Sequence, residues 1–235
     1  VEVPTTVVTA DFSEKVDISD FGDGTYLYGG GSHNSVVIEF NDYIAVIEAP
    51  LNESRNLAVI DEIVKHIPNK PIRFLINTHQ HHDSIGGLRT YMHIGATIIT
   101  HWKNYEFYTR DVLNYSPRTL DPDMVSLWPP TELAEGYQYE VVRENYVLTD
   151  GERMMQLSYV HPLSHVEGML VAYLPDQKML IEADLFNSFE LSEGEASDAN
   201  QSLYNHVQRL GLDVETIVPI HGEPRTWEDF VNILN

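Results

Sequence analysis

Apolar residues in the first half of the chain alternate between runs of strand length and one stretch with helical spacing. Two apolar segments, residues 35–40 and 43–48, flank a short polar turn and predict a β-hairpin. Apolar residues then recur at helical spacing, which predicts an amphipathic helix over residues 54–66 that a proline ends. The runs over residues 71–76 and 96–100 predict two more strands. This order of strands and helices is typical of a layered α/β fold.

The second half of the chain continues the same alternation without a repeat of fixed length. We expect strands over residues 137–147, 154–160, 169–174 and 217–222. We expect helices over residues 102–113, 202–210 and 226–234. In such folds, ligand sites favour the carboxyl ends of strands, so the residues that follow each strand are the first candidates for a functional site.

A dense group of histidines follows the predicted strand over residues 71–76. His79, His81 and Asp83 alternate along the chain, so in an extended segment their side chains project to the same side. Two imidazoles and a carboxylate on one side suit a borderline metal such as zinc.

Three further imidazole or carboxylate groups stand near strand ends: His165, Asp184 and His221. A single histidine in a strand is more often partly buried and hydrogen-bonded than a metal ligand. Several such groups together with the histidine motif favour a metal site instead.

Composition narrows the classes of partner. The chain has 14 Lys and Arg against 36 Asp and Glu, a formal charge of −22, which disfavours nucleic acid and anionic membranes. No apolar run reaches the roughly 18 residues of a membrane span. The absence of cysteine excludes disulfides and thiolate ligands. Among the classes of partner, we therefore expect a small-molecule substrate. The composition does not indicate an oligomeric state.

With these motifs in place, the chain resembles the metallo-β-lactamase superfamily. The resemblance rests on residues 78–83, His165 with Gly168, residues 183–186 and residues 218–222. It implies an αββα sandwich of the α/β (α+β) class, with two mixed sheets flanked by helices. We therefore expect one domain over residues 21–235, preceded by a leader or edge segment at residues 1–20.

The resemblance also implies a site for two zinc ions, with iron or manganese as alternatives. The first metal is expected at His79, His81 and His165. The second is expected at Asp83, Asp184 and His221, with Asp184 lying between the metals if it bridges them as in the glyoxalase-like branch.

The chain departs from the family pattern at the second metal. Many relatives have a histidine ligand where Ser84 stands here, and class B lactamases have a cysteine where Asp184 stands. Those lactamases also have a lysine soon after that cysteine, which is missing here. Three protein ligands remain, so we expect weak or partial occupancy of the second site.

Four other residues are candidates to surround the ligands without binding metal: His82, Ser84, Glu48 and His33. Alternation turns His82 away from the ligands. Glu48 is either a support for the ligands or a surface carboxylate, and His33 either lines the pocket or is an ordinary loop histidine. His161 is an alternative to His165, which we prefer because Gly168 and an apolar strand follow it.

The implied activity is a zinc-dependent hydrolase of lactam, lactone, ester or amide bonds, in which Asp83 orients the attacking water and moves its proton. The alternatives are a glyoxalase II-like thioesterase, an iron-dependent persulfide dioxygenase and a non-catalytic metal-binding protein. The start at Val1 instead of Met indicates a processed or trimmed chain. Together with the lactamase likeness it favours a periplasmic or secreted protein over a cytoplasmic one.

Overall fold

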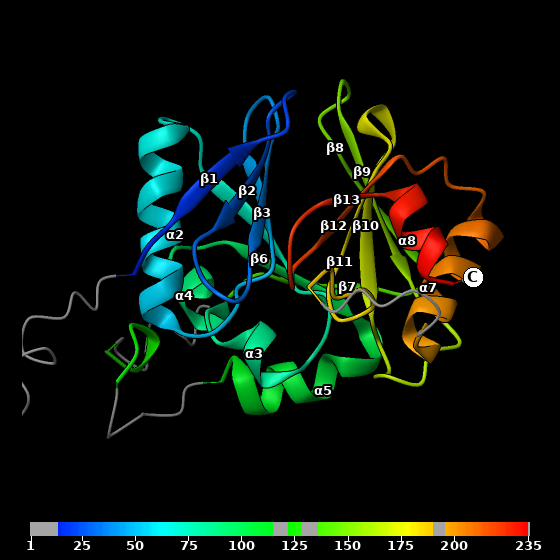
Figure 1. Ribbon diagram of the computed structural model, residues 1–235. Helices are drawn as coiled ribbons and strands as arrows, with labels where there is room; N and C mark the ends of the chain where they lie inside the picture. The colour runs from blue at the N-terminus through cyan, green and yellow to red at the C-terminus, as the bar shows by residue number, and fades with distance from the viewer. Residues whose placement is uncertain (1–13, 115–121, 128–135, 190–195, 235) are drawn as a thin grey trace, which may run out of the picture.

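The computed structural model describes residues 14–114, 122–127, 136–189 and 196–234. These residues form two β-sheets that face each other, with helices on the outer side of both (Figure 1). The predicted αββα sandwich is thus confirmed.

The first sheet carries the N-terminal half of the chain. Its strand order is β1 (Asp17–Asp20), β2 (Thr25–Gly29), β3 (Ser35–Glu39), β4 (Ile44–Ile47), β5 (Ile72–Ile76), β6 (Thr97–His101) and β7 (Tyr139–Val142). The strands from β1 to β4 pair antiparallel, and those from β4 to β7 pair parallel. Because parallel strands end at the same edge, the segments that follow β4 and β5 leave the sheet side by side.

The second sheet carries the C-terminal half. Its strand order is β13 (Arg225–Thr226), β12 (Thr216–Pro219), β11 (Met179–Glu182), β10 (Leu170–Leu174), β9 (Met154–Tyr159) and β8 (Asn145–Thr149). The strands β11 and β12 are parallel, while β10 is antiparallel to β11. The end of β11, the end of β12 and the start of β10 therefore meet at one edge of the sheet.

Between the sheets lies a core to which both contribute alternate residues. Val36 and Ile38 on β3 face Leu157 on β9 and Ile181 on β11 in one buried cluster. Val37, which points the other way, packs in a separate cluster with the helices outside the first sheet. Because both faces of each sheet are covered, the central strands are apolar almost without interruption.

Helices outside the first sheet are α2 (Glu53–His66), α3 (His82–Ile85) and α4 (Leu88–His93). Those outside the second sheet are α7 (Asp198–Leu210) and α8 (Trp227–Ile233) (Figure 1). The side chain of Asn52 caps the start of α2, and capping boxes begin α7 at Ser197 and α8 at Thr226. These boundaries lie within a few residues of the predicted ones.

Two predicted elements differ in part from the structure. Residues 137–147 do not form one strand, because the chain passes from the first sheet to the second between β7 and β8. Residues 102–112 are helical, as predicted, but their pitch changes along the segment, from η1 (Trp102–Asn104) through α5 (Tyr105–Phe107) to η2 (Tyr108–Val112). Elsewhere in the described chain, η3 (Val125–Leu127) and η4 (Pro175–Gln177) are 3₁₀ turns.

The predicted leader or edge segment is described only in part. Residues 17–20 form β1, an edge strand paired with β2, whereas residues 1–13 lie outside the described residues. Among the helices that the structure describes, none has the length and apolar character needed to cross a membrane.

Candidate metal centre

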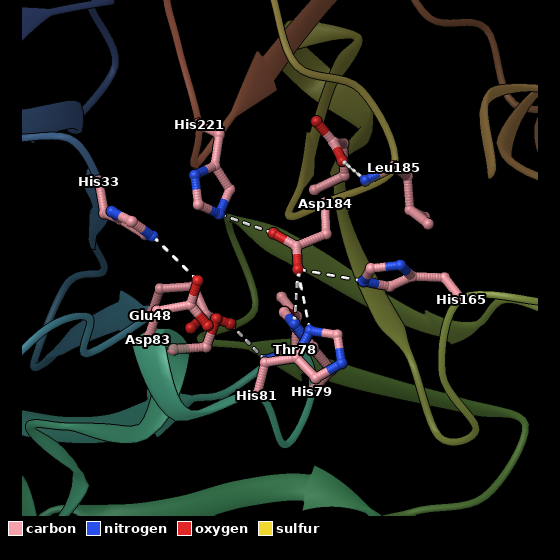
Figure 2. A network of polar contacts seen from close by, with 12 residues as sticks. His33, Glu48, Thr78, His79, His81, Asp83, His165, Asp184, Leu185 and His221 are labelled. Atoms are coloured by element: carbon pink, nitrogen blue, oxygen red, sulfur yellow. Dashed lines mark hydrogen bonds and ion pairs between the residues drawn. The ribbon is translucent and has the colours of Figure 1, made fainter. Parts of the chain in front are cut away.

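Three imidazoles converge on one carboxylate oxygen at the edge where the two sheets meet (Figure 2). His79 and His81 leave the end of β5, His165 precedes β10, and Asp184 follows β11. The Asp184 Oδ2 atom lies 2.9 Å from His79 Nε2, 3.2 Å from His81 Nδ1 and 3.1 Å from His165 Nε2. These four residues form the first donor group, whose ligand atoms all lie within 4.8 Å of one another.

A second donor group lies beside the first and consists of His33, Asp83 and His221. The His33 Nε2 atom is 3.4 Å from Asp83 Oδ2, and the rings of His33 and His221 meet edge to face with centroids 4.0 Å apart. His221 follows β12, and its Nε2 atom is 2.6 Å from Asp184 Oδ1. Asp184 therefore directs one oxygen to each group.

A strained turn holds Asp184 between the two groups. Its φ of 62° is in the left-handed region, which non-glycine residues occupy mainly at tight turns or functional sites. The buried Glu182 carboxylate accepts hydrogen bonds from the backbone N–H groups of Leu185 (2.9 Å) and Phe186 (3.2 Å). Burial raises the pKa of Glu182 well above its usual value. Glu182 thus fixes the turn from inside the protein.

The first donor group has the chemistry of a metal site. His79 Nε2 is buried and lacks a hydrogen bond of good geometry, although it faces Asp184. A single carboxylate oxygen facing three imidazole nitrogens cannot satisfy all of them well, whereas a cation among them would. Imidazole and carboxylate donors without thiolates fit zinc and other borderline divalent metals.

Electrostatics favour the protonation states that bind metal. Burial lowers the pKa of His79, which keeps its imidazole neutral. Burial acts to raise the pKa of Asp184, but the imidazoles of His221 and His79 beside the carboxylate outweigh it and hold that pKa far below its usual range. Burial also acts to raise the pKa of Asp83. Hydrogen bonds from its own backbone N–H and from His33 outweigh burial, so the pKa of Asp83 is lower than usual. Both carboxylates are therefore ionised at neutral pH.

A buried polar network supports the backbone that carries His79. Glu48 has no exposed surface and accepts hydrogen bonds from the backbone N–H of Thr78 (2.5 Å) and from Asn77 Nδ2 (3.0 Å). The hydroxyl of Tyr108 donates to Asn77 Oδ1. Burial raises the pKa of Glu48 to about 7. Glu48 is therefore a support beneath the centre and not a surface carboxylate.

All six residues expected as ligands lie in one of the two groups. The prediction that Asp83 projects to the same side as His79 and His81 is wrong, because the chain turns into α3 at His82 and does not stay extended. Asp83 consequently faces His33 and not the first group. His161 lies outside both groups, with Nε2 at 3.3 Å from Glu144 and its ring stacked on Tyr159.

Besides Glu48, three residues were expected to surround the ligands without binding metal: His82, Ser84 and His33. His82 belongs to neither donor group among the described residues. Ser84 is buried, and its hydroxyl has no hydrogen-bond partner in the described part of the chain. His33 joins the second group, a role that the sequence did not assign to it. The only hint was its place after three glycines, which permit a tight loop near a ligand.

A four-layer sandwich whose strand ends gather histidines and aspartates is the architecture of one class of metal-dependent hydrolases. The model of the metallo-beta-lactamase superfamily matches residues 28–221, and the chain belongs to that superfamily. Family membership and the donor groups together support a metal-dependent hydrolase. No curated protein sequence matches the chain significantly.

Solved structures of metallo-β-lactamases share this fold at low sequence identity. A metallo-beta-lactamase from Pontibacter korlensis aligns with a TM-score of 0.71 and 14% identity, over 94% of this chain and 97% of that one. The mono-zinc form of FIM-1 from Pseudomonas aeruginosa aligns with a TM-score of 0.65 and 16% identity, over 93% of each chain. TMB-1 aligns with a TM-score of 0.67 and 20% identity, over 93% of this chain and 95% of that one. At such identities the likeness establishes the fold alone.

Proposed function

We propose that the protein is a zinc-dependent hydrolase that cleaves a C–N or C–O bond of a small lactam, lactone, ester or amide. The observation that carries this proposal is the convergence of His79, His81 and His165 on Asp184 Oδ2. We assign the first metal to the three histidines. We assign the second to Asp83, Asp184 and His221.

Zinc bound in such a site lowers the pKa of water from about 15.7 to about 7, which supplies a nucleophile at neutral pH. The chain's own residues then handle orientation and proton movement. Asp83 is ionised and its side chain is 31% exposed, so it can accept the proton of the attacking water. It returns that proton to the nitrogen or oxygen that leaves the carbonyl carbon. No serine or cysteine nucleophile is needed.

A thioesterase of the glyoxalase II kind is the second candidate. It is supported by Asp184, whose two oxygens each face one donor group, as expected of a bridging carboxylate. Some class B lactamases resemble this chain in having a serine at the position of Ser84, but they have a cysteine in place of Asp184. The substrate classes to compare are therefore lactams, lactones and thioesters.

Elemental analysis of the purified protein, combined with hydrolysis assays on those three substrate classes, tests the proposal. We expect zinc and hydrolysis of at least one class. His79→Ala should lose hydrolysis and the first zinc, whereas the control His66→Ala, at an exposed position outside both donor groups, should keep both. His79→Ala should remain folded by circular dichroism. About one iron per chain together with oxygen uptake would show a dioxygenase, and full hydrolysis by His79→Ala would refute the metal assignment.

A further inference from the structure

We propose that His33 is a protein ligand of the second metal, where it supplies the imidazole that Ser84 does not. This inference rests on the proposed metal-dependent function. It adds a fourth donor to Asp83, Asp184 and His221, so the second site would contain two imidazoles and two carboxylates.

The spacing between His33 and Asp83 fits a shared cation better than a direct hydrogen bond. Their nearest atoms are 3.4 Å apart, whereas N–H···O hydrogen bonds are normally about 2.7–3.2 Å long. Two ligands that each lie about 2.1 Å from a tetrahedral zinc are about 3.4 Å from each other. The ligand atoms of His33, Asp83 and His221 also lie within 4.8 Å of one another, so one ion can reach all three.

The imidazole of His33 is oriented as a ligand would be. The hydroxyl of Ser32 lies 2.8 Å from His33 Nδ1, which leaves Nε2 to face the second group. His79 has the same arrangement, because the hydroxyl of Thr78 lies 2.9 Å from His79 Nδ1 and Nε2 faces the first group. Metal-binding histidines usually engage their second nitrogen in this way, which fixes the ring.

The loop that carries His33 is anchored to the segment that carries His221. The backbone N–H of Asn34 donates to Ile220 O (2.9 Å), and Asn34 Nδ2 donates to Gly222 O (2.9 Å). At the loop's start, the buried guanidinium of Arg55 donates to Gly29 O (2.7 Å). His33 itself is only 8% exposed. A histidine held this firmly on both sides differs from an ordinary loop histidine.

This arrangement changes the expected strength of the second site. Three protein ligands predict weak occupancy, whereas four from well-anchored segments predict two metals per chain. His33 and Asp83 come from the first sheet's edge, and Asp184 and His221 come from the second (Figure 2). The second ion would therefore join the two halves of the sandwich.

The test has two parts. A competing chelator removes zinc stepwise from the zinc-loaded full chain, which gives the affinity of each metal equivalent. Co²⁺ is then bound in place of zinc, and its absorption spectrum reports the ligands. The variants are His33→Ala and His33→Gln, and the matched control is His161→Ala, a histidine outside both donor groups. We expect two equivalents of metal in the parent. Both His33 variants should bind the first equivalent normally and the second at least tenfold more weakly, with fewer nitrogen ligands in the Co²⁺ spectrum.

His33→Gln separates coordination from packing, because glutamine keeps most of the side-chain volume against His221 but is a poor zinc ligand. Parent-like affinity for the second equivalent in both His33 variants would overturn the inference and leave the proposed hydrolase intact. A parent that binds a single equivalent would do the same. A parent that binds no metal would overturn the inference and the proposed function together.

Discussion

Acid should destabilise the protein through His206, a buried histidine that belongs to neither donor group. His206 lies on α7 and is 2% exposed. Arg209 Nη2 is 2.9 Å from His206 Nδ1, and Ser158 Oγ is 2.8 Å from His206 Nε2. Because a guanidinium can only donate, Nδ1 must accept and the imidazole must be neutral, with its proton on Nε2. Protonation would place a buried cation directly against the guanidinium of Arg209.

The size of this effect follows from the pKa of His206. Burial, and then the charge of Arg209, lower that pKa from 6.5 to about 4. In the unfolded chain the imidazole takes up its proton near pH 6.5, whereas in the folded protein it does so only near pH 4. The unfolded state therefore binds more protons between these values, and the free energy of unfolding falls as the pH falls. The loss is about 1.4 kcal/mol per pH unit, or about 2 kcal/mol between pH 7 and pH 5.

The assay is urea unfolding at pH 7 and pH 5 of the parent, His206→Gln and His66→Gln, with a chelator present so that acid release of metal does not contribute. Glutamine keeps a donor near Ser158 but cannot be protonated. Between the two pH values the parent should lose about 2 kcal/mol more than His206→Gln, because only the parent carries the buried imidazole. His66 is exposed, so His66→Gln should follow the parent. Equal losses in the parent and His206→Gln would refute the reasoning.

Two further substitutions test how the backbone around the centre is held. Gly222→Ala should lower the free energy of unfolding by about 2 kcal/mol or more, because φ is 119° and a Cβ would lie 2.2 Å from Ser188 Oγ. The control Gly151→Ala, where φ is 94° and the space around the Cβ is open, should lower the free energy of unfolding by only about 1 kcal/mol. Equal losses of unfolding free energy in the two variants would contradict the predicted clash at Ser188. Arg55→Met removes donors to three backbone carbonyls and should cost at least about 2 kcal/mol in urea unfolding. The exposed Arg73→Met should change stability by less than about 0.5 kcal/mol, and a parent-like Arg55→Met would show that those hydrogen bonds are dispensable.

A strand could be predicted from the sequence where its whole apolar segment lies in one sheet. The segments over residues 35–40 and 71–76 became β3 and β5 because covered strands require apolar side chains on both faces. The segment over residues 137–147 was misjudged because β7 and β8 have the same local character. Which sheet each strand joins depends on partners, β6 and β9, that no local window contains.

The first donor group was predictable from its motif, whereas the second was only partly so. His79 and His81 are two positions apart in one motif. His165 and Asp184 stand near strand ends, and the family resemblance assigned them to the site. His33 lies 50 positions before Asp83 and could be recognised only through its contacts. His33 is held near Asp83 and His221 by Asn34, which is hydrogen-bonded to the segment after β12. No local sequence pattern indicates this hydrogen bond.

The two donor groups are held together by the backbone of the sandwich as well as by their own side chains. The N–H of Leu170, in the second sheet, donates to Thr78 O beside His79 (2.9 Å), and the N–H of Asn34 donates to Ile220 O beside His221 (2.9 Å). Each hydrogen bond joins a segment of the first sheet to one of the second at the position next to a donor. Replacing a donor side chain removes no atom of these bonds, because they involve only main-chain atoms. Loss of metal in a ligand variant therefore reports on coordination and not on separation of the sheets, which is why the substitutions at His79 and His33 can be interpreted directly.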